Sequence, residues 1–168
     1  MQTLAKLTAS FPRSGAVHWI GLRPARGQAM KKVDQARLEL TGLEGDRRAK
    51  PGKRAVTLIQ AEHLPVIAAL AGHYAIEPET LRRNILVSGI PLAALRGRTF
   101  RIGTAVLRGT DLCAPCSRME AALGAGGYNA MRGHGGICAE VLVPGNVAIG
   151  DEVTDLATPD QPGISAPS

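Results

Sequence analysis

The sequence predicts a protein that is mainly β, folded as a distorted closed β-barrel decorated by a few helices. Short apolar runs of strand length recur along the chain, and turns containing glycine separate them. Glycine contributes 20 of the 168 residues, which is more than its usual share and indicates many tight turns. Only a few segments carry the 3.6-residue apolar period of a helix. Short strands with frequent glycine turns are typical of closed barrels.

The first half of the chain carries three expected strands and one expected helix. Residues 17–22 form an apolar run that ends at an Arg-Pro pair, and residues 36–40 alternate apolar and polar side chains with period two. A glycine turn follows at 42–46, and residues 55–59 form a short β-rich run. Residues 61–72 are expected to form a helix, because their apolar side chains share one face and a glycine stands at the end.

The second half continues with short elements. They are expected, in chain order, as a helix at 78–83, a strand at 85–87, two strands within 99–107, a helix at 117–123, a strand at 137–143, a turn at 144–146 and a closing segment at 147–153. The domain is therefore expected to span residues 15–153. A flexible N-terminal arm at 1–14 precedes it, and a proline-rich disordered tail at 154–168 follows it.

The composition narrows the class of partner. The formal net charge of +6 suits an anionic partner, although charge alone fits an ordinary solvated surface equally well. The five scattered aromatic residues argue against a binder of single-stranded nucleic acid. No apolar run is long enough for a membrane span, so no membrane association is expected. Three cysteines fit a reducing compartment better than a disulfide scaffold, which predicts a cytoplasmic protein.

The sharpest chemical motif is the segment CAPCSRME at 113–120. Ser117 and Glu120 have the spacing of a capping box, which predicts a helix that starts at Ser117. Cys116 would then lie just outside the helix N-terminus, where the helix dipole and the neighbouring Arg118 favour a thiolate. Such a thiolate suits a soft metal ion or a sulfur-transfer reaction.

Other interpretations of the cysteines stay open. Cys113 and Cys116 could form a redox pair, or both could be small buried structural residues. A zinc site completed by His134 and Cys138 is a further option, because the first two cysteines have ligand spacing.

Three further segments could hold an anion. The glycine turn at 42–48 contains one acid and two arginines, and its backbone N–H groups could bind an anion. Arg82 and Arg83 could grip a phosphate, and the glycine-rich loop at 132–136 allows close approach to a ligand. Each also has a plain alternative: an ordinary turn, exposed charges at a helix end, and a flexible hairpin loop.

Taken in order, these segments resemble the MOSC domain, the C-terminal domain of molybdenum cofactor sulfurases. The matching pieces include GLEGDR at 42–47, RAVTLIQAEH at 54–63, LRRNILVSG at 81–89, CAPCSRME at 113–120 and RGHGGICAEVL at 132–142. The resemblance covers residues 15–153 and implies a distorted β-barrel with an exposed cysteine near its end, identified here with Cys116. Arg48 departs from the pattern, since the family often has a histidine at that place.

The resemblance also implies a cofactor and a site. In amidoxime-reducing relatives the cysteine ligates molybdenum held by a pterin dithiolene, and in the sulfurases it is thought to carry sulfur. By that analogy the pocket for the pterin and its phosphate is lined by Asp46, Arg47, Arg83, Asn84 and Arg132. An isolated domain could hold the molybdenum cofactor weakly, receive it from a partner or lack it.

Three functional hypotheses follow. The first is a small molybdenum-cofactor reductase of N-hydroxylated or similar oxidised small molecules, with Cys116 as catalytic metal ligand and an external electron donor. The second is a sulfur carrier or cofactor-delivery module that uses a Cys116 persulfide and a sulfurase partner. The third is a non-catalytic anion-binding module that uses only its charge.

Overall fold

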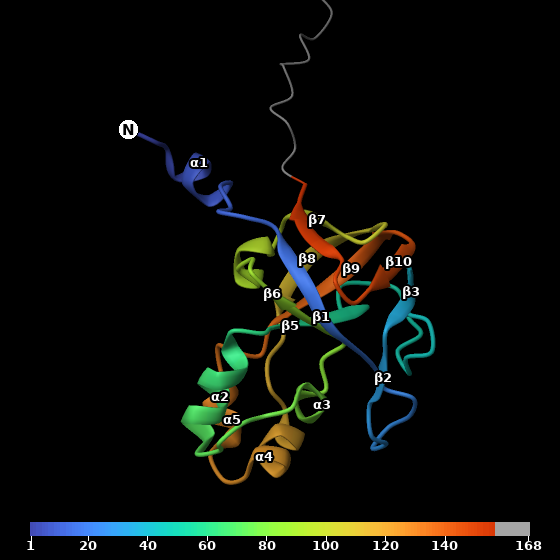
Figure 1. Cartoon of the computed structure of the whole chain (residues 1–168), viewed down its shortest axis with the longest axis vertical. Helices are drawn as coiled ribbons and strands as arrows, with labels where there is room; N and C mark the ends of the chain where they lie inside the picture. The colour runs from blue at the N-terminus through green and yellow to red at the C-terminus, as the bar shows by residue number, and fades with distance from the viewer. Residues whose placement is uncertain (157–168) are drawn as a thin grey trace, which may run out of the picture.

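The protein folds around a closed seven-stranded barrel, described here from a computed structural model that covers residues 1–156 (Figure 1). Its strands are β1 (Gly15–Leu22), β5 (Val56–Gln60), β6 (Ile85–Ser88), β7 (Thr99–Ile102), β8 (Ala105–Leu112), β9 (Ile137–Val143) and β11 (Glu152–Asp155). The strand order is β11-β7-β8-β9-β5-β6-β1, and β11 also pairs with β1, which closes the ring. The predicted closed barrel is confirmed.

Four shorter strands extend the barrel, and four of the helices gather at one of its ends (Figure 1). These strands and all the helices have the following bounds. They are β2 (Lys31–Val33), β3 (Gln35–Glu39), β4 (Gly42–Leu43), β10 (Gly145–Ala148), a 3₁₀ turn (Leu92–Leu95), α1 (Leu4–Thr8), α2 (His63–Ala71), α3 (Pro78–Leu81), α4 (Ser117–Leu123) and α5 (Gly127–Met131). Strand β2 pairs with β1, while β10, β3 and β4 form a separate small sheet. Helices α2, α3, α4 and α5 form the cluster at the barrel end. None of the helices within residues 1–156 has the length and apolar character to cross a membrane.

The barrel strands bury apolar side chains on two sides, which explains their sequence pattern. Ile20, Leu58, Ile85 and Phe100 belong to the main core and are fully buried. A second apolar cluster on the helix side contains Trp19, Ile59, Ile67, Leu81, Leu86, Met119, Leu123 and Met131. Strand β5 lies between the two clusters, so all five of its residues are buried. A strand covered on both faces has a continuous apolar run rather than an alternating one.

Several expected boundaries differ from the structure. The turn expected at 144–146 is wrong, because β10 begins at Gly145 and pairs with β3. Helix α5 (Gly127–Met131) lies between the expected helix at 117–123 and the expected strand at 137–143, where no helix was expected. The N-terminal arm contains the exposed helix α1, and β11 continues to Asp155, two residues past the expected end of the domain. The rest of the expected tail, residues 157–168, lies outside the described residues.

The capping-box interpretation of Ser117 and Glu120 is also wrong. Helix α4 does begin at Ser117, but its N-cap residue is Cys116, and no side chain caps it. The Glu120 carboxylate instead accepts hydrogen bonds from the backbone N–H groups of Gly126 and Tyr128, both at 2.7 Å. Those N–H groups belong to the first turn of α5 and its N-cap, where a helix needs acceptors. Glu120 therefore connects α4 to α5.

We predict that Glu120→Ala loosens the start of α5, whereas Ser117→Ala leaves it unchanged. The reason is that only Glu120 satisfies the N–H groups of Gly126 and Tyr128. Amide hydrogen exchange, resolved by residue, should accelerate at these two positions in the Glu120 variant alone. Equal acceleration in both variants would restore the capping box.

Candidate functional site

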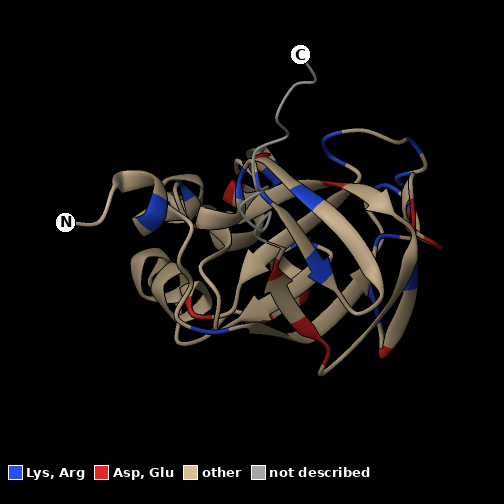
Figure 2. Cartoon of the chain, turned by 90° about the horizontal axis from the view of Figure 1, so that it is seen from above, with Lys and Arg blue, Asp and Glu red and all other residues tan. Residues whose placement is uncertain are grey.

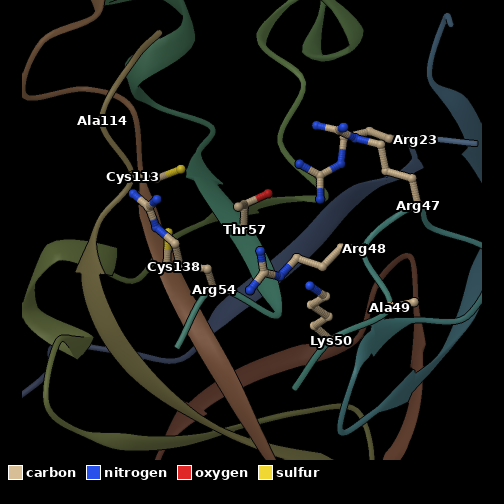
Figure 3. Close-up of a pocket in the computed structure, with 10 residues that line it drawn as sticks. All are labelled: Arg23, Arg47, Arg48, Ala49, Lys50, Arg54, Thr57, Cys113, Ala114 and Cys138. Carbon is tan, nitrogen blue, oxygen red and sulfur yellow. The ribbon is translucent and has the colours of Figure 1, made fainter. Parts of the chain in front are cut away.

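One mouth of the barrel opens into a cavity of about 510 Å³. It is lined by Arg23, Arg47, Arg48, Ala49, Lys50, Arg54, Thr57, Cys113, Ala114 and Cys138 (Figure 3). These residues follow β1, β4 and β8 or stand near the starts of β5 and β9, so the topology brings them to the same end of the barrel. Five of the ten are cationic and none is acidic. Figure 2 shows that basic residues also occur on other strands and loops around the barrel. The five cationic residues named here line one pocket.

The floor of this cationic pocket is built on Asp46. Its carboxylate accepts from the Arg23 backbone N–H at 2.7 Å and from the Arg23 guanidinium at 3.1 and 2.9 Å. It also accepts from the Asn84 amide and the Arg48 backbone N–H, each at 3.1 Å. The exposed fractions of the side chains are 1% for Asp46 and 12% for Arg23. Asp46 therefore ties the end of β1 to the loop that carries Arg47 and Arg48.

The pKa of Asp46 reflects this environment. Burial raises the pKa, but the Arg23 hydrogen bonds and charge, together with the Arg48 N–H, outweigh burial and leave it below its ordinary value of 3.8. The carboxylate is thus stabilised in its ionised form. It neutralises Arg23 and leaves the other cations around the pocket without this acidic partner.

Asn84, the residue just before β6, completes the same floor. Its side-chain oxygen accepts from the Thr57 hydroxyl at 3.0 Å, and its amide donates to the Gly21 carbonyl at 3.1 Å. Its backbone N–H donates to the Thr57 hydroxyl oxygen at 3.0 Å. Asn84 is fully buried and cross-links three adjacent strands. The structure therefore places Asn84 beneath the pocket rather than on its wall.

Arg83 points toward the cysteine segment. Its guanidinium donates to the backbone carbonyls of Gly135 at 2.9 Å, Cys113 at 3.1 Å and Ala114 at 3.2 Å. The residue is buried, and these bonds use its donors on the protein's own backbone. Arg83 thus holds the segment after β8 in place, and it is not among the residues that line the cationic pocket.

The three cysteines occupy different environments. Cys113 and Cys138 are buried and line the cationic pocket, whereas Cys116 is exposed at the N-cap of α4 and is not among the lining residues. Hydrogen bonding with Cys138 lowers the pKa of the Cys113 thiol, and the charges of Arg83 and Arg54 lower it further. Burial raises this pKa, but the net shift is downward. The pKa of Cys138 is raised by the same hydrogen bond and by burial.

The structure brings together only part of the expected site. Arg47 lines the cationic pocket, Asp46 and Asn84 lie under it, and Arg83 supports its cysteine wall. Arg132 is exposed and lines a separate cavity of about 180 Å³, which shares Cys113 and Ala114 with the larger one.

Arg23, Arg54, Thr57 and Cys138 line this pocket but are not among the residues predicted from the sequence to line it. The dense run of basic residues at 47–54 was the one signal pointing there. Arg23 and Cys138 reach the pocket only because strands that are far apart in the sequence pair with each other.

Arg48 shows what the pocket is suited to bind. Its Nε is buried and has no hydrogen-bond partner among the described residues. A buried donor without an acceptor is costly, and so is a cluster of like charges. An anionic group in the pocket would relieve both costs. The residues present therefore fit an anionic, phosphate-bearing ligand.

Comparison with known proteins agrees with this architecture. Residues 25–154 match the sequence model of the family described as MOSC domain. The chain belongs to the MOSC domain family. No curated protein matches it. MOSC domains are associated with the molybdenum cofactor, so this is a domain related to that cofactor.

Solved structures share the fold of this MOSC domain. The YUAD protein from Bacillus subtilis superposes with a TM-score of 0.75 at 22% identity, covering 86% of this chain and 97% of that one. YiiM from Escherichia coli gives 0.68 at 21% identity, covering 87% and 71%. YiiM from Geobacillus stearothermophilus gives 0.70 at 15% identity, covering 84% and 75%. At these identities the likeness concerns the fold alone.

We predict that Asp46→Ala destabilises the fold by about 3–5 kcal/mol, because it leaves the Arg23 charge partly buried and unpaired. Urea unfolding should show this loss at neutral pH. Glu39→Ala serves as a control, because the Arg37–Glu39 pair is exposed and is worth less than about 1 kcal/mol.

The Asp46 contribution also predicts a pH dependence. Because folding lowers the pKa of Asp46, its stabilisation is present above the ordinary value of 3.8 and is lost as pH falls through the lower folded value. Asp46→Asn should therefore be less stable than the wild type at neutral pH and should approach it in acid. A constant difference in unfolding free energy from pH 7 to pH 2 would contradict this.

Proposed function

We propose that this MOSC domain binds a molybdenum–pterin cofactor in the cationic pocket and acts as a small reductase of N-hydroxylated or similarly oxidised small molecules. The observation that carries the proposal is the pocket itself. It combines five cationic side chains, an unpartnered buried donor on Arg48 and an adjacent cysteine segment, in a chain of a family associated with this cofactor. When bound, the cofactor would supply a metal that accepts and donates electrons.

In this scheme the chain's own residues bind and position the cofactor. Arg47, Arg48, Lys50 and Arg54 would hold the phosphate and exclude cations from the pocket. Asp46 orients the loop by accepting the Arg48 backbone N–H. These side chains reach the pocket from a loop whose base is tied to β1, so the ligand would meet a preorganised set of donors.

The second group of supporting residues acts on the cysteine segment. Arg83 holds the carbonyls of Cys113 and Ala114, and Asn84 maintains the floor. Arg132, on the neighbouring cavity, would contact the substrate or the cofactor's outer part from the other side of that segment.

We propose Cys116 as the metal ligand. Ala114, two residues earlier, lines the pocket, and Cys116 is exposed at the start of α4. An exposed thiol at that position is free of competing hydrogen bonds from its own helix cap. An external electron donor would reach the same exposed mouth, in the reducing cytoplasm that free thiols favour.

We predict that the protein purified from a host making the cofactor contains molybdenum and pterin, and that Cys116→Ala loses the molybdenum. Metal analysis and pterin fluorescence measure both in one sample. Ser117→Ala is the matched neighbour control and should keep full content. Circular dichroism and thermal unfolding confirm that each variant folds.

Two results would contradict the ligand assignment. One is full molybdenum content in folded Cys116→Ala. The other is loss of molybdenum in Cys113→Ser with full content in Cys116→Ala, which would move the ligand to the pocket wall.

An Arg48→Ala, Arg54→Ala double variant should lower pterin content, because the phosphate loses two of its cations.

A second candidate function is favoured by the exposure of Cys116. A thiol at the surface is accessible to a partner protein that donates sulfur, whereas the buried Cys113 and Cys138 are not. Cys116 would then carry a persulfide for delivery to the cofactor, and the basic mouth would dock an acidic sulfurase.

We predict for this second candidate that incubation with a cysteine desulfurase and cysteine adds the mass of one sulfur atom. The added mass should disappear with reductant and be absent from Cys116→Ala. Sulfur found on Cys113 or Cys138 would argue against it.

The non-catalytic binding module would be favoured by anion binding that falls steeply with salt and is unchanged in Cys116→Ala, in a protein that carries neither cofactor nor persulfide.

A further inference from the structure

Cys113 and Cys138 form a pair of thiols in the pocket wall that the proposed function leaves unused. Both are buried, and both line the cationic pocket. Figure 3 shows the two thiols on one side of the cavity, with Arg54 beside them and Arg47, Arg48 and Lys50 across from them. The pair is thus open to a ligand that enters the pocket.

The strand register determines how the two cysteines meet. Leu112 on β8 is opposite Ile137 on β9, and the Cys113 N–H donates to the Gly136 carbonyl at 2.8 Å. Cys113 is therefore opposite Gly136, and Cys138 is its diagonal neighbour on the same face. Diagonal neighbours have α-carbons about 7–8 Å apart, which is beyond the usual span of a disulfide, about 4.4–6.8 Å. The register therefore favours two thiols that share one bound atom over a disulfide.

The backbone around the pair is held tightly. Arg83 donates to the carbonyls of Cys113 and Gly135. A β-carbon at Gly135 would lie 2.1 Å from the Cys113 carbonyl oxygen, so the two segments are in direct backbone contact. The spacing of the thiols is therefore built into the fold, as a metal site requires.

The surrounding charges suit an anionic complex of the two thiolates. The positive charges of Arg83 and Arg54 lower the pKa of the Cys113 thiol, and Arg54 acts in the same direction on the pKa of Cys138. A monovalent cation held by two thiolates carries one net negative charge, which these guanidinium groups would compensate. A free cation would be repelled by the same pocket, so delivery as an anionic thiolate complex is favoured.

The ligand count selects the metal. Within residues 1–156 no three His, Cys, Asp or Glu side chains gather so as to hold one ion. The four-ligand zinc site considered from the sequence is therefore wrong: Cys116 is exposed, and the His134 ring instead packs edge-on against His63 with centroids 5.0 Å apart. Structural zinc needs four ligands. Cu(I), a soft ion, is selected by thiolates and is stable between two of them.

We propose that Cys113 and Cys138 bind one Cu(I) ion as a bis-thiolate in the wall of the cationic pocket. The ion arrives as a complex with two small thiolates. One Cys thiolate and one Cys thiol replace them, and the small molecules leave as one thiol and one thiolate, so charge and protons balance and no electron is transferred. The inference is independent of the proposed cofactor, because it uses cysteines that ligate nothing in that scheme.

The test uses the full chain, reduced and metal-free, with Cu(I) supplied under anaerobic conditions against a chromophoric Cu(I) chelator. Wild type and Cys116→Ser are expected to hold one Cu(I) per chain with equal affinity. Altering groups outside the ligand set already costs about 10–100-fold in metal affinity. Cys113→Ser and Cys138→Ser, each losing a ligand, should therefore bind more than about 100-fold more weakly. Thermal unfolding of the metal-free variants checks that each is folded.

Each outcome bears on the proposal. Affinity that survives in folded Cys113→Ser and Cys138→Ser, or that is lost in Cys116→Ser, would overturn it. So would a wild type that yields all its Cu(I) to the chelator, or equal retention of Zn²⁺ in a parallel titration. Formation of a 113–138 disulfide on mild oxidation, mapped in Cys116→Ser so that Cys116 cannot take part, would overturn the proposal in favour of a redox pair.

Discussion

The buried carboxylate of Asp46 is the interaction on which the mouth of the barrel depends. Five donors from Arg23, Arg48 and Asn84 converge on its two oxygens. A charge buried this deeply is tolerated only when it is paired and fully hydrogen bonded. These donors lie just after β1, in the loop after β4 and just before β6. One side chain therefore sets the relative position of three segments. The cationic pocket exists because this floor keeps its arginine-bearing loop from moving away.

The arginines around the pocket divide into two classes by what their donors contact. Arg23 and Arg83 direct theirs to a carboxylate and to backbone carbonyls, so they build the site. Arg47 and Arg48 extend into the pocket, and the Arg48 Nε has no partner within the described residues. Only the second class is available to a ligand. Formal charge alone would count all of them as binding residues.

The cysteines show a similar division, because exposure and location separate them. Cys116 begins a helix at the surface, where a partner or a bound cofactor can reach it. Cys113 and Cys138 lie in the pocket wall, brought together by the pairing of β8 with β9. A barrel end with both arrangements offers two kinds of thiol chemistry beside one anion site. The proposed molybdenum ligand and the proposed Cu(I) site use different members of the three.

The sequence by itself determined the barrel, the start of α4 at Ser117, the strand Ile137–Val143 and the placement of Cys116 just before a helix. These follow from local periodicity and turn residues, which act over a few neighbouring positions. The tertiary structure alone decided that Glu120 caps α5, that Arg83 supports rather than binds, and that Cys138 joins Cys113. The physical reason is that these roles depend on which backbone groups and side chains meet across paired strands and neighbouring helices. Residues 83 and 113, or 113 and 138, are brought together only when the barrel closes.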